Sequence, residues 1–325
     1  ELKASPEGSL KVINKNKNYI SSKFMAVTAD FRATEAAVKI LKSGGTAIDA
    51  AISAQMVLNL VEPQSSGIGG GAFILYFDNN SKTITAWDGR EKAPLSYEET
   101  VFLKQDGGRK GFIEAVSGGL SVGAPPLISL LEKVHKQYGN LEWHLLFDDA
   151  IKYSLSGFIV GKRLEKLINR APHLKNTKSG RDYFELAKGG LKEGQLKKNV
   201  RFGKTLIEIK NNGSSAILEG QIQEAIIKEV NNHETNPGNL SKKDFSIINP
   251  KKSAPICSFY RGWKICGMGP PSSGGITVFQ ILGILENFNL AQLKQEEVWH
   301  LYSEASKLAY YDRNYYIADK EYVDV

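Results

Sequence analysis

EPQSSGIGGGAFILYFDNNSKTITAWDGREKAP, residues 62–94, combines a glycine-rich turn, two strand patterns and an arginine. Residues 72–77 form an apolar and aromatic run, residues 78–81 form a polar turn, and residues 83–87 alternate with period two. Two strand patterns separated by a short polar turn are typical of a β-hairpin. The stretch therefore predicts a hairpin that ends at Asp88-Gly89-Arg90.

The glycines that precede the first strand are Gly67, Gly69, Gly70 and Gly71. Glycine tolerates positive φ angles and lets the backbone approach other groups closely, so we expect both features here. A dinucleotide-binding fingerprint needs a strand before its glycines and a helix after them. Because a strand follows these glycines, the pattern argues against a dinucleotide site and favours a close-packed turn that leads into a buried strand.

The composition is that of a globular protein. The chain has 325 residues, of which 42% are hydrophobic and 24% charged, so it can bury a large core. It has no apolar run of about 18 residues, and we expect no membrane span. The net charge is +7, but the lysines are scattered, which favours a solvated basic surface and no nucleic-acid partner.

The remaining elements follow from periodicity and capping residues. Residues 1–23 are expected to form a polar leader, and because no apolar leader is present, the chain is either cytoplasmic or has lost a signal peptide. We expect a strand at 25–28 and a helix capped by Asp30 or Thr34. Further expected segments are a buried helix at 46–60, a helix opening at Pro125 or Pro126, a polar surface segment at 172–200, helices at 204–212 and 220–231, a capped turn at 241–245, and helices at 276–288 and 296–312.

The two cysteines, Cys257 and Cys266, lie symmetrically about Arg261-Gly262. A two-residue hairpin turn at these positions would place the cysteines opposite each other at a non-hydrogen-bonded pair. Such a pair suits a disulfide in an oxidising compartment. A disulfide and two buried free thiols both remain open.

Several familiar catalytic motifs are incomplete. Ser121 lies in a G-x-S-x-G match, but Pro125-Pro126 places the next helix start too late for a nucleophile elbow. Gly203-Lys204-Thr205 ends like a phosphate loop, yet Lys198 stands where its first glycine should be. Ser272 and Ser273 are interpreted as turn formers with free hydroxyls. The histidines, which belong to no metal motif, are His135, His144, His173, His233 and His300, with His144 and Asp148 on a solvated helix face.

Arg90 follows the second strand and is flanked by a glycine. Its guanidinium offers a rigid fork of donors that can pair with a carboxylate through two hydrogen bonds. A structural salt bridge with Asp88 or Glu91 would satisfy the same side chain. From the residues alone, both interpretations stand.

A series of motifs from about Phe24 to the end resembles the large subunit of γ-glutamyltranspeptidases. They occur in the family's order and at about its spacing, and they read GGTAIDAAISAQMVLNLVEPQSSGIGGGAFILYFD, DGREKAP, LSVGAPP, HKQYG, GFIV, LEGQIQEAI, FYRGWKI and PPSSGGITVFQILGILENF. The resemblance implies an α/β (α+β) fold, the large-subunit part of the four-layer αββα sandwich of N-terminal nucleophile hydrolases. Residues 24–325 would then be one portion of a domain that a separate small subunit completes.

The resemblance also implies an activity and few site residues. The family's precursor cuts itself to expose a threonine nucleophile on the small subunit, so no catalytic residue is expected in this chain. Arg90 matches the arginine that grips the α-carboxylate of the γ-glutamyl group. The segment 270–275 matches a structural turn near the subunit junction, and the family's G-x-P turn at 123–125 makes Ser121 no nucleophile.

By resemblance, the complete enzyme is a γ-glutamyltransferase or glutathione hydrolase, a heterodimer formed by autoproteolysis of a zymogen. It would need no metal and no organic cofactor, and it would be periplasmic or secreted. Two alternatives remain. One is a related acylase acting on β-lactam side chains or poly-γ-glutamate, and the other is a non-catalytic homologue.

Overall fold

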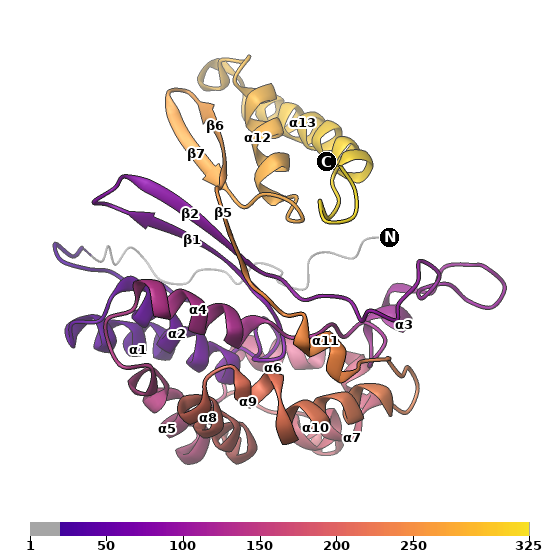
Figure 1. Cartoon of the computed structure of the whole chain (residues 1–325). Helices are drawn as coiled ribbons and strands as arrows, with labels where there is room; N and C mark the ends of the chain where they lie inside the picture. The colour runs from indigo at the N-terminus through magenta and orange to yellow at the C-terminus, as the bar shows by residue number, and fades with distance from the viewer. Residues whose placement is uncertain (1–19, 325) are drawn as a thin grey trace. The chain divides into compact units, whose positions relative to one another are not determined.

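The computed structural model describes residues 20–324, with its elements labelled in Figure 1. The described residues form two compact units, one made of residues 20–72 and 89–250, the other of residues 73–88 and 251–324. The predicted leader at 1–23 falls mostly on residues 1–19, which lie outside the described residues. The prediction of a single domain portion at 24–325 stays a prediction.

The first unit is mainly helical. Its α-helices are α1 (Phe31–Lys42), α2 (Ala47–Val61), α3 (Phe112–Val116), α4 (Leu127–Tyr138), α5 (Asp148–Ser156), α6 (Lys162–Asn169), α7 (Lys178–Tyr183), α8 (Val200–Asn212), α9 (Ser215–Leu218), α10 (Gly220–Asn231) and α11 (Lys242–Ser246). Short 3₁₀ helices are η1 (Trp143–Phe147), η2 (Pro172–Asn176) and η3 (Leu186–Lys188). Within the described residues, no helix is both long and apolar enough to cross a membrane.

Helix α2 is the centre of this unit. Thr46 caps it by accepting a hydrogen bond from the backbone N–H of Asp49, whose carboxylate accepts from the Thr46 backbone in return. Buried residues occupy most of its faces, and it contacts α1, α4 and α5. Figure 1 shows α2 between α1 and α4. The buried helix predicted for residues 46–60 is confirmed.

Helix α1 begins where predicted, but the prediction of a strand at 25–28 is wrong. Asp30 caps the helix by accepting from the backbone of Arg32, and Ser43 ends it. Residues 25–28 have no regular secondary structure, and the Val27 side chain is 83% exposed. A strand needs a neighbour for its ladder, and no described strand pairs with this segment.

The segment 172–200, expected on the surface, is partly buried. Leu191 is fully buried, and the Nζ atom of Lys197 lies 2.9 Å from the Glu185 carboxylate. The segment is anchored by an antiparallel pair, β3 (Phe158–Ile159) and β4 (Leu196–Lys197). This pair has no sequence signal, because strands of two residues show no period and depend on a distant partner.

The second unit contains a sheet of β1 (Ala72–Asp78), β2 (Thr83–Gly89) and β5 (Lys251–Ser253), in the order β1-β2-β5. The predicted hairpin is confirmed, and β5, which was not predicted, pairs antiparallel with β2. The apolar strand β1 was expected to be buried, but Leu75 and Phe77 are 45% and 55% exposed. An apolar run shows that a strand can be buried, whereas only packing against other elements buries it.

A second hairpin consists of β6 (Ile256–Tyr260) and β7 (Trp263–Gly267). Arg261 and Gly262 both have positive φ in its turn, and Cys257 pairs with Cys266 across the strands. The Cα atoms of the two cysteines are 4.1 Å apart and the residues form a disulfide. The predicted cross-strand placement is confirmed, and of the two open alternatives the structure contains the bridge.

Helices α12 (Gly274–Leu285) and α13 (Gln295–Tyr316) complete the second unit, joined by the short 3₁₀ helix η4 (Leu290–Gln292). Their seam is a small core formed by Ile281, Leu285, Ala305 and Ala309. Helix α12 also contacts β6 and β7. Both predicted helices are present, with α13 longer than expected.

Candidate substrate-binding site

Arg90 lies directly after β2, with its side chain exposed and the preceding Gly89 buried. A Cβ atom on Gly89 would lie 2.6 Å from Cδ2 and 2.7 Å from Cβ of Leu130 on α4. Real Cβ atoms do not approach other carbons so closely. The glycine therefore lets the end of β2 lie against α4, and this contact fixes where the Arg90 side chain starts.

The glycine-rich turn holds the other side of the Arg90 backbone. A Cβ atom on Gly71 would lie 2.3 Å from the carbonyl oxygen of Gly89 and 3.1 Å from the Cα of Arg90. The Gly71 N–H donates a 2.7 Å hydrogen bond to Oε1 of Glu91. Glu91 is thus used in holding the turn against the strand end, so the chain around Arg90 is fixed from both directions.

Positive φ angles and close backbone approach were both expected at the four glycines, and only one of these expectations is right. Close approach is confirmed at Gly71, but none of the four glycines has a positive φ. Gly67 and Gly69 have open space where a Cβ would lie. The turn is therefore built by ordinary backbone angles, and glycine is required at Gly71 for lack of room and not for conformation.

A third segment, residues 123–127, closes around the residues that follow Arg90. The Ala124 N–H donates a 2.9 Å hydrogen bond to the Lys92 carbonyl, and the Leu127 N–H donates a 3.1 Å hydrogen bond to the Gly70 carbonyl. A Cβ atom on Gly123 would lie 2.5 Å from the Lys92 carbonyl oxygen. The motifs GIGGG, DGREKAP and LSVGAPP, far apart in sequence, therefore meet at Arg90.

The chain beyond Arg90 is anchored by two further hydrogen bonds. The Tyr97 hydroxyl donates to the Leu120 carbonyl at 2.8 Å, and burial raises the pKa of Tyr97, which keeps the hydroxyl protonated. The Leu95 N–H donates to Oδ1 of the buried Asp244 at 2.7 Å. Asp244 also closes the capping box of α11 with Ser241, as predicted for the capped turn at 241–245.

The combined arrangement presents one exposed guanidinium on a rigid backbone. Such a group can bind a planar anion such as a carboxylate with two parallel hydrogen bonds, and little entropy is lost because the backbone is already fixed. We call the segments 67–71, 89–92 and 123–127 the glycine-braced site. The sequence pointed to Arg90, but it did not reveal Gly71, Gly89 and Gly123 as the residues that position it.

The other candidate residues have structural environments. The Ser121 hydroxyl donates to the Val116 carbonyl at 3.0 Å, and Gly203 lies inside α8 against Ser154 and Leu155. Ser273 begins α12, and its hydroxyl accepts a 2.9 Å hydrogen bond from Nε of Arg313. Ser273 is therefore the residue that precedes the first turn of α12, and its hydroxyl is not free, in contrast to the prediction.

The histidines are not gathered in one place. Nε2 of His135 lies 3.3 Å from Oδ1 of Asp49, and Nδ1 of His233 accepts hydrogen bonds from the backbone N–H groups of Thr235 and Asn236. Asp148, considered beside His144, pairs instead with Lys210 at 2.7 Å. In the part of the chain that the structure describes, no group of three or more His, Cys, Asp or Glu side chains is arranged to hold a metal ion.

Comparison with known proteins identifies close similarity over nearly the whole chain. The family model "Gamma-glutamyltranspeptidase" matches residues 33–325. The glutathione hydrolase proenzyme of Bacillus subtilis subsp. natto is 34% identical over 303 residues, which are 93% of this chain and 51% of the relative. The chain thus spans about half the length of the curated relatives that it matches.

Solved structures also resemble this chain over most of its length. The γ-glutamyltranspeptidase of Helicobacter pylori aligns with a TM-score of 0.89 and 32% identity, covering 95% of this chain and 88% of that chain. A cephalosporin acylase from Bacillus halodurans aligns with a TM-score of 0.79 and 27% identity, covering 90% of this chain and 54% of that chain. The predicted fold class, the large-subunit part of an N-terminal nucleophile hydrolase, is confirmed by this similarity.

Proposed function

Because the chain belongs to the γ-glutamyltranspeptidase family, we propose that it forms the large-subunit part of a γ-glutamyltransferase or glutathione hydrolase. The substrates are γ-glutamyl amides such as glutathione. The partner is a small subunit cut from the same precursor, and the two subunits form a heterodimer. The names of the matched relatives, which are proenzymes and glutathione hydrolases, support this assignment.

The observation that carries the proposal is the exposed Arg90 on its glycine-braced backbone. In the proposed complex, the guanidinium binds the α-carboxylate of the γ-glutamyl group through two charge-assisted hydrogen bonds. Binding at this end of the substrate limits how far the γ-carbonyl can lie from Arg90, because only three carbon atoms separate the two groups. A rigid anchor of this kind is what positions a reacting carbonyl for attack.

The attacking group in this proposal is a threonine at the N-terminus of the small subunit. Its hydroxyl oxygen attacks the γ-carbonyl carbon, and its α-amine accepts the hydroxyl proton. The proton passes to the leaving amine as the C–N bond breaks, which leaves a γ-glutamyl ester on the threonine. Water or an amine acceptor then attacks the ester and restores the threonine hydroxyl. No metal or organic cofactor takes part.

We further propose that the protein is periplasmic or secreted. The Cys257–Cys266 disulfide supports this location, because disulfides persist in oxidising compartments and are rare in the reducing cytosol.

A related acylase remains the second candidate, and the similarity to a cephalosporin acylase favours considering it. The two functions differ in the substrate's acyl group. A γ-glutamyl donor carries an α-carboxylate and an α-amine, whereas a glutaryl donor lacks the amine and poly-γ-glutamate is a polymer.

The test is to purify the full-length protein and measure hydrolysis of glutathione, a γ-glutamyl anilide, a glutaryl anilide and poly-γ-glutamate. We expect the highest kcat/KM with the two small γ-glutamyl substrates. Intact mass spectrometry should show a second chain that begins with threonine. A preference for the glutaryl or polymeric substrate would replace the proposal with the acylase, and failure to cleave any of them, without a second chain, would indicate a non-catalytic homologue.

A further inference from the structure

The positive charge of the chain is concentrated in one stretch. Residues 152–204 contain 14 Lys and Arg residues but only 4 Asp and Glu residues, so the stretch has a net charge of +10, whereas the whole chain has +7. Most of these basic side chains are exposed. The lysines are therefore less evenly scattered than expected, and a concentration of this kind attracts anionic surfaces and polymers.

The β3–β4 pair in this stretch has one buried face and one exposed face. Phe158 pairs with Lys197, and Ile159 pairs with Leu196. Phe158 and Lys197 are 3% and 9% exposed, whereas Ile159 and Leu196 are 53% and 55% exposed. Residues directly opposite each other on two strands point to the same face. The two exposed apolar side chains therefore lie side by side.

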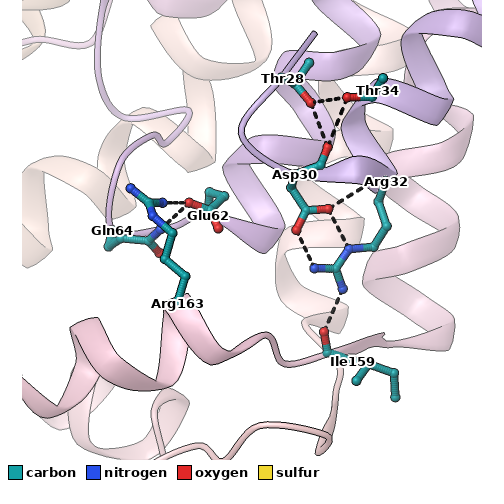
Figure 2. A network of polar contacts seen from close by, with 8 residues as sticks. All are labelled: Thr28, Asp30, Arg32, Thr34, Glu62, Gln64, Ile159 and Arg163. Atoms are coloured by element: carbon teal, nitrogen blue, oxygen red, sulfur yellow. Dashed lines mark hydrogen bonds and ion pairs between the residues drawn. The ribbon is translucent and has the colours of Figure 1, made fainter. Parts of the chain in front are cut away.

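Buried ion pairs hold β3 and β4 in place. Figure 2 shows the Arg32 guanidinium paired with the Asp30 carboxylate at 2.6 Å and donating a 2.7 Å hydrogen bond to the Ile159 carbonyl. Nζ of Lys197 lies 2.9 Å from the Glu185 carboxylate. Arg32 and Lys197 are both buried, so breaking either pair would leave a charge removed from water. The apolar face of the β3–β4 pair is therefore presented to solvent by a fixed backbone.

Two neighbouring helices extend this apolar face. Gly157 ends α5, and a Cβ atom there would lie 2.8 Å from Cδ1 of Leu196. A Cβ atom on Gly203 of α8 would lie 3.0 Å from Cδ2 of Leu155, at the end of α5. Leu155 is 40% exposed, and Val200, which begins α8, is 47% exposed. We call these exposed side chains the apolar patch: Leu155, Ile159, Leu196 and Val200.

Basic side chains neighbour the apolar patch on the same elements. Lys152 and Lys204 lie on α5 and α8, each about one helical turn from the patch residue of that helix. Lys198 follows β4 directly, and Arg201 is the second residue of α8. All four are exposed, and the three lysines form no ion pair with any residue that the structure describes. Their charges are therefore available to an external partner.

We propose that this surface binds a membrane that contains anionic lipids. The apolar patch enters the boundary between headgroups and acyl chains, and the basic side chains contact the lipid phosphates. A nucleic acid would use the charge but would leave the apolar side chains in water, so the combination favours a membrane. The protein lies on the membrane surface without spanning it. This binding goes beyond the proposed γ-glutamyl transfer and does not depend on it.

The test is co-sedimentation of the purified full-length protein with lipid vesicles. One set of vesicles contains phosphatidylcholine with about 30% phosphatidylglycerol, and the other contains phosphatidylcholine alone. At about 0.1 M salt we expect binding to the anionic vesicles to be at least tenfold stronger. Raising the salt concentration to about 0.5 M should weaken it, because salt screens exposed charges.

Two lysine variants test the contribution of charge. Lys198→Gln combined with Lys204→Gln should weaken binding to the anionic vesicles about 30-fold, because two charges next to the membrane are lost. Lys228→Gln combined with Lys243→Gln removes two exposed lysines on α10 and α11, outside the stretch. This control should bind within about twofold of the wild-type protein.

Two further variants test the contribution of the apolar patch. Ile159→Ser combined with Leu196→Ser should weaken binding at least about tenfold, because the apolar area that enters the membrane is lost. Phe112→Ser combined with Ile113→Ser is the control, at residues of α3 that are 77% and 50% exposed. It should bind within about twofold of the wild-type protein, and a thermal melt should show that each variant is folded.

Absence of binding to the anionic vesicles, or equal binding to both kinds of vesicle, would overturn the proposal. Undiminished binding in the folded lysine variant or in the folded apolar variant would also overturn it, as would an equally large loss in the controls. Binding of a DNA duplex without binding to vesicles would assign the surface to a nucleic acid instead.

Discussion

The hairpins β1–β2 and β6–β7 are stabilised by different kinds of contact. In β6–β7, the turn residues Arg261 and Gly262 and the cross-strand disulfide all lie within the hairpin. The β1–β2 hairpin has its own turn, but the ends of its strands are held by residues from distant segments. Gly71 and Gly89 lie against each other, and Gly89 also lies against Leu130.

The difference shows what each hairpin does. The disulfide closes β6–β7 within the hairpin itself, and α12 and Glu286, which accepts a 2.7 Å hydrogen bond from the Arg261 N–H, add contacts from the neighbouring chain. In β1–β2, the position of the Arg90 backbone depends on contacts with α4 and with segment 123–127, because these segments pack against the residues next to Arg90. We therefore expect substitutions in β6–β7 to change stability without changing substrate affinity, and substitutions at the base of β1–β2 to change both.

The largest effect is expected for Gly71→Ala. The added Cβ would lie 2.3 Å from the Gly89 carbonyl oxygen, and backbone atoms cannot move away cheaply. We expect a loss of about 3 kcal/mol in the free energy of unfolding, measured by urea denaturation, together with a raised KM for a γ-glutamyl anilide.

Gly67→Ala is the matched control, because the Cβ would meet nothing within 4 Å and the φ angle is not positive. It should leave both quantities close to their wild-type values. If Gly71→Ala behaved like Gly67→Ala, the bracing of Arg90 by the glycine turn would be wrong.

Removing the disulfide should have the next largest effect. Cys257→Ser combined with Cys266→Ser releases a short loop, for which chain entropy gives a loss of about 2.5 kcal/mol in the stability of the second unit. KM should not change. In the wild-type protein, mass spectrometry without reduction should show no alkylation of the cysteines, and two adducts per chain would contradict the bridge.

Arg90→Lys should change substrate affinity and leave folding unaffected. Lysine keeps the charge but loses the planar fork, so we expect KM for a γ-glutamyl anilide to rise at least about tenfold, or about 1.4 kcal/mol. The melting temperature should change little, because lysine keeps the positive charge and the side chain at this position is exposed.

Arg201→Lys, at another exposed arginine of the same unit, provides the control and should leave KM unaltered. An unchanged KM in Arg90→Lys would remove Arg90 from the substrate site.

The smallest effect is expected for Tyr97→Phe, which removes the hydrogen bond to the Leu120 carbonyl. We expect a loss of about 0.5–1 kcal/mol in the free energy of unfolding, since the hydroxyl is only partly buried. Burial raises the pKa of Tyr97, so its contribution is present below the unfolded-state pKa of about 10 and is lost as the pH rises through the raised value.

The wild-type protein should therefore lose more stability than Tyr97→Phe between about pH 9 and pH 11, as followed by thermal melts. Parallel pH profiles for the two proteins would show that Tyr97 does not brace the chain beyond Arg90.

Elements with strong local signals were predicted well. The period-two pattern at 83–87 identified β2, and Thr46 with an alanine-rich apolar run identified α2. The positions of Cys257 and Cys266 about Arg261-Gly262 were enough to place them opposite each other. In each case, the residues that specify the element lie within or next to it.

Elements that depend on distant partners were missed or wrong. Residues 25–28 have no strand neighbour with which to form a ladder, and β3, β4 and β5 are too short to show a period. The glycine-rich turn at 67–71 also shows that local sequence does not reveal long-range contacts. Its four glycines suggested positive φ angles. The structure instead shows that Gly71 is needed where another strand end passes close by.

By itself, the sequence determined the hairpins, the buried α2 helix, the cross-strand placement of the two cysteines and the candidate Arg90, since local periodicity, capping and motif order carry this information. Tertiary structure alone decided that the motifs GIGGG, DGREKAP and LSVGAPP meet. It also decided that Gly71, Gly89 and Gly123 leave no room for a side chain, because close packing arises only when segments distant in sequence come into contact.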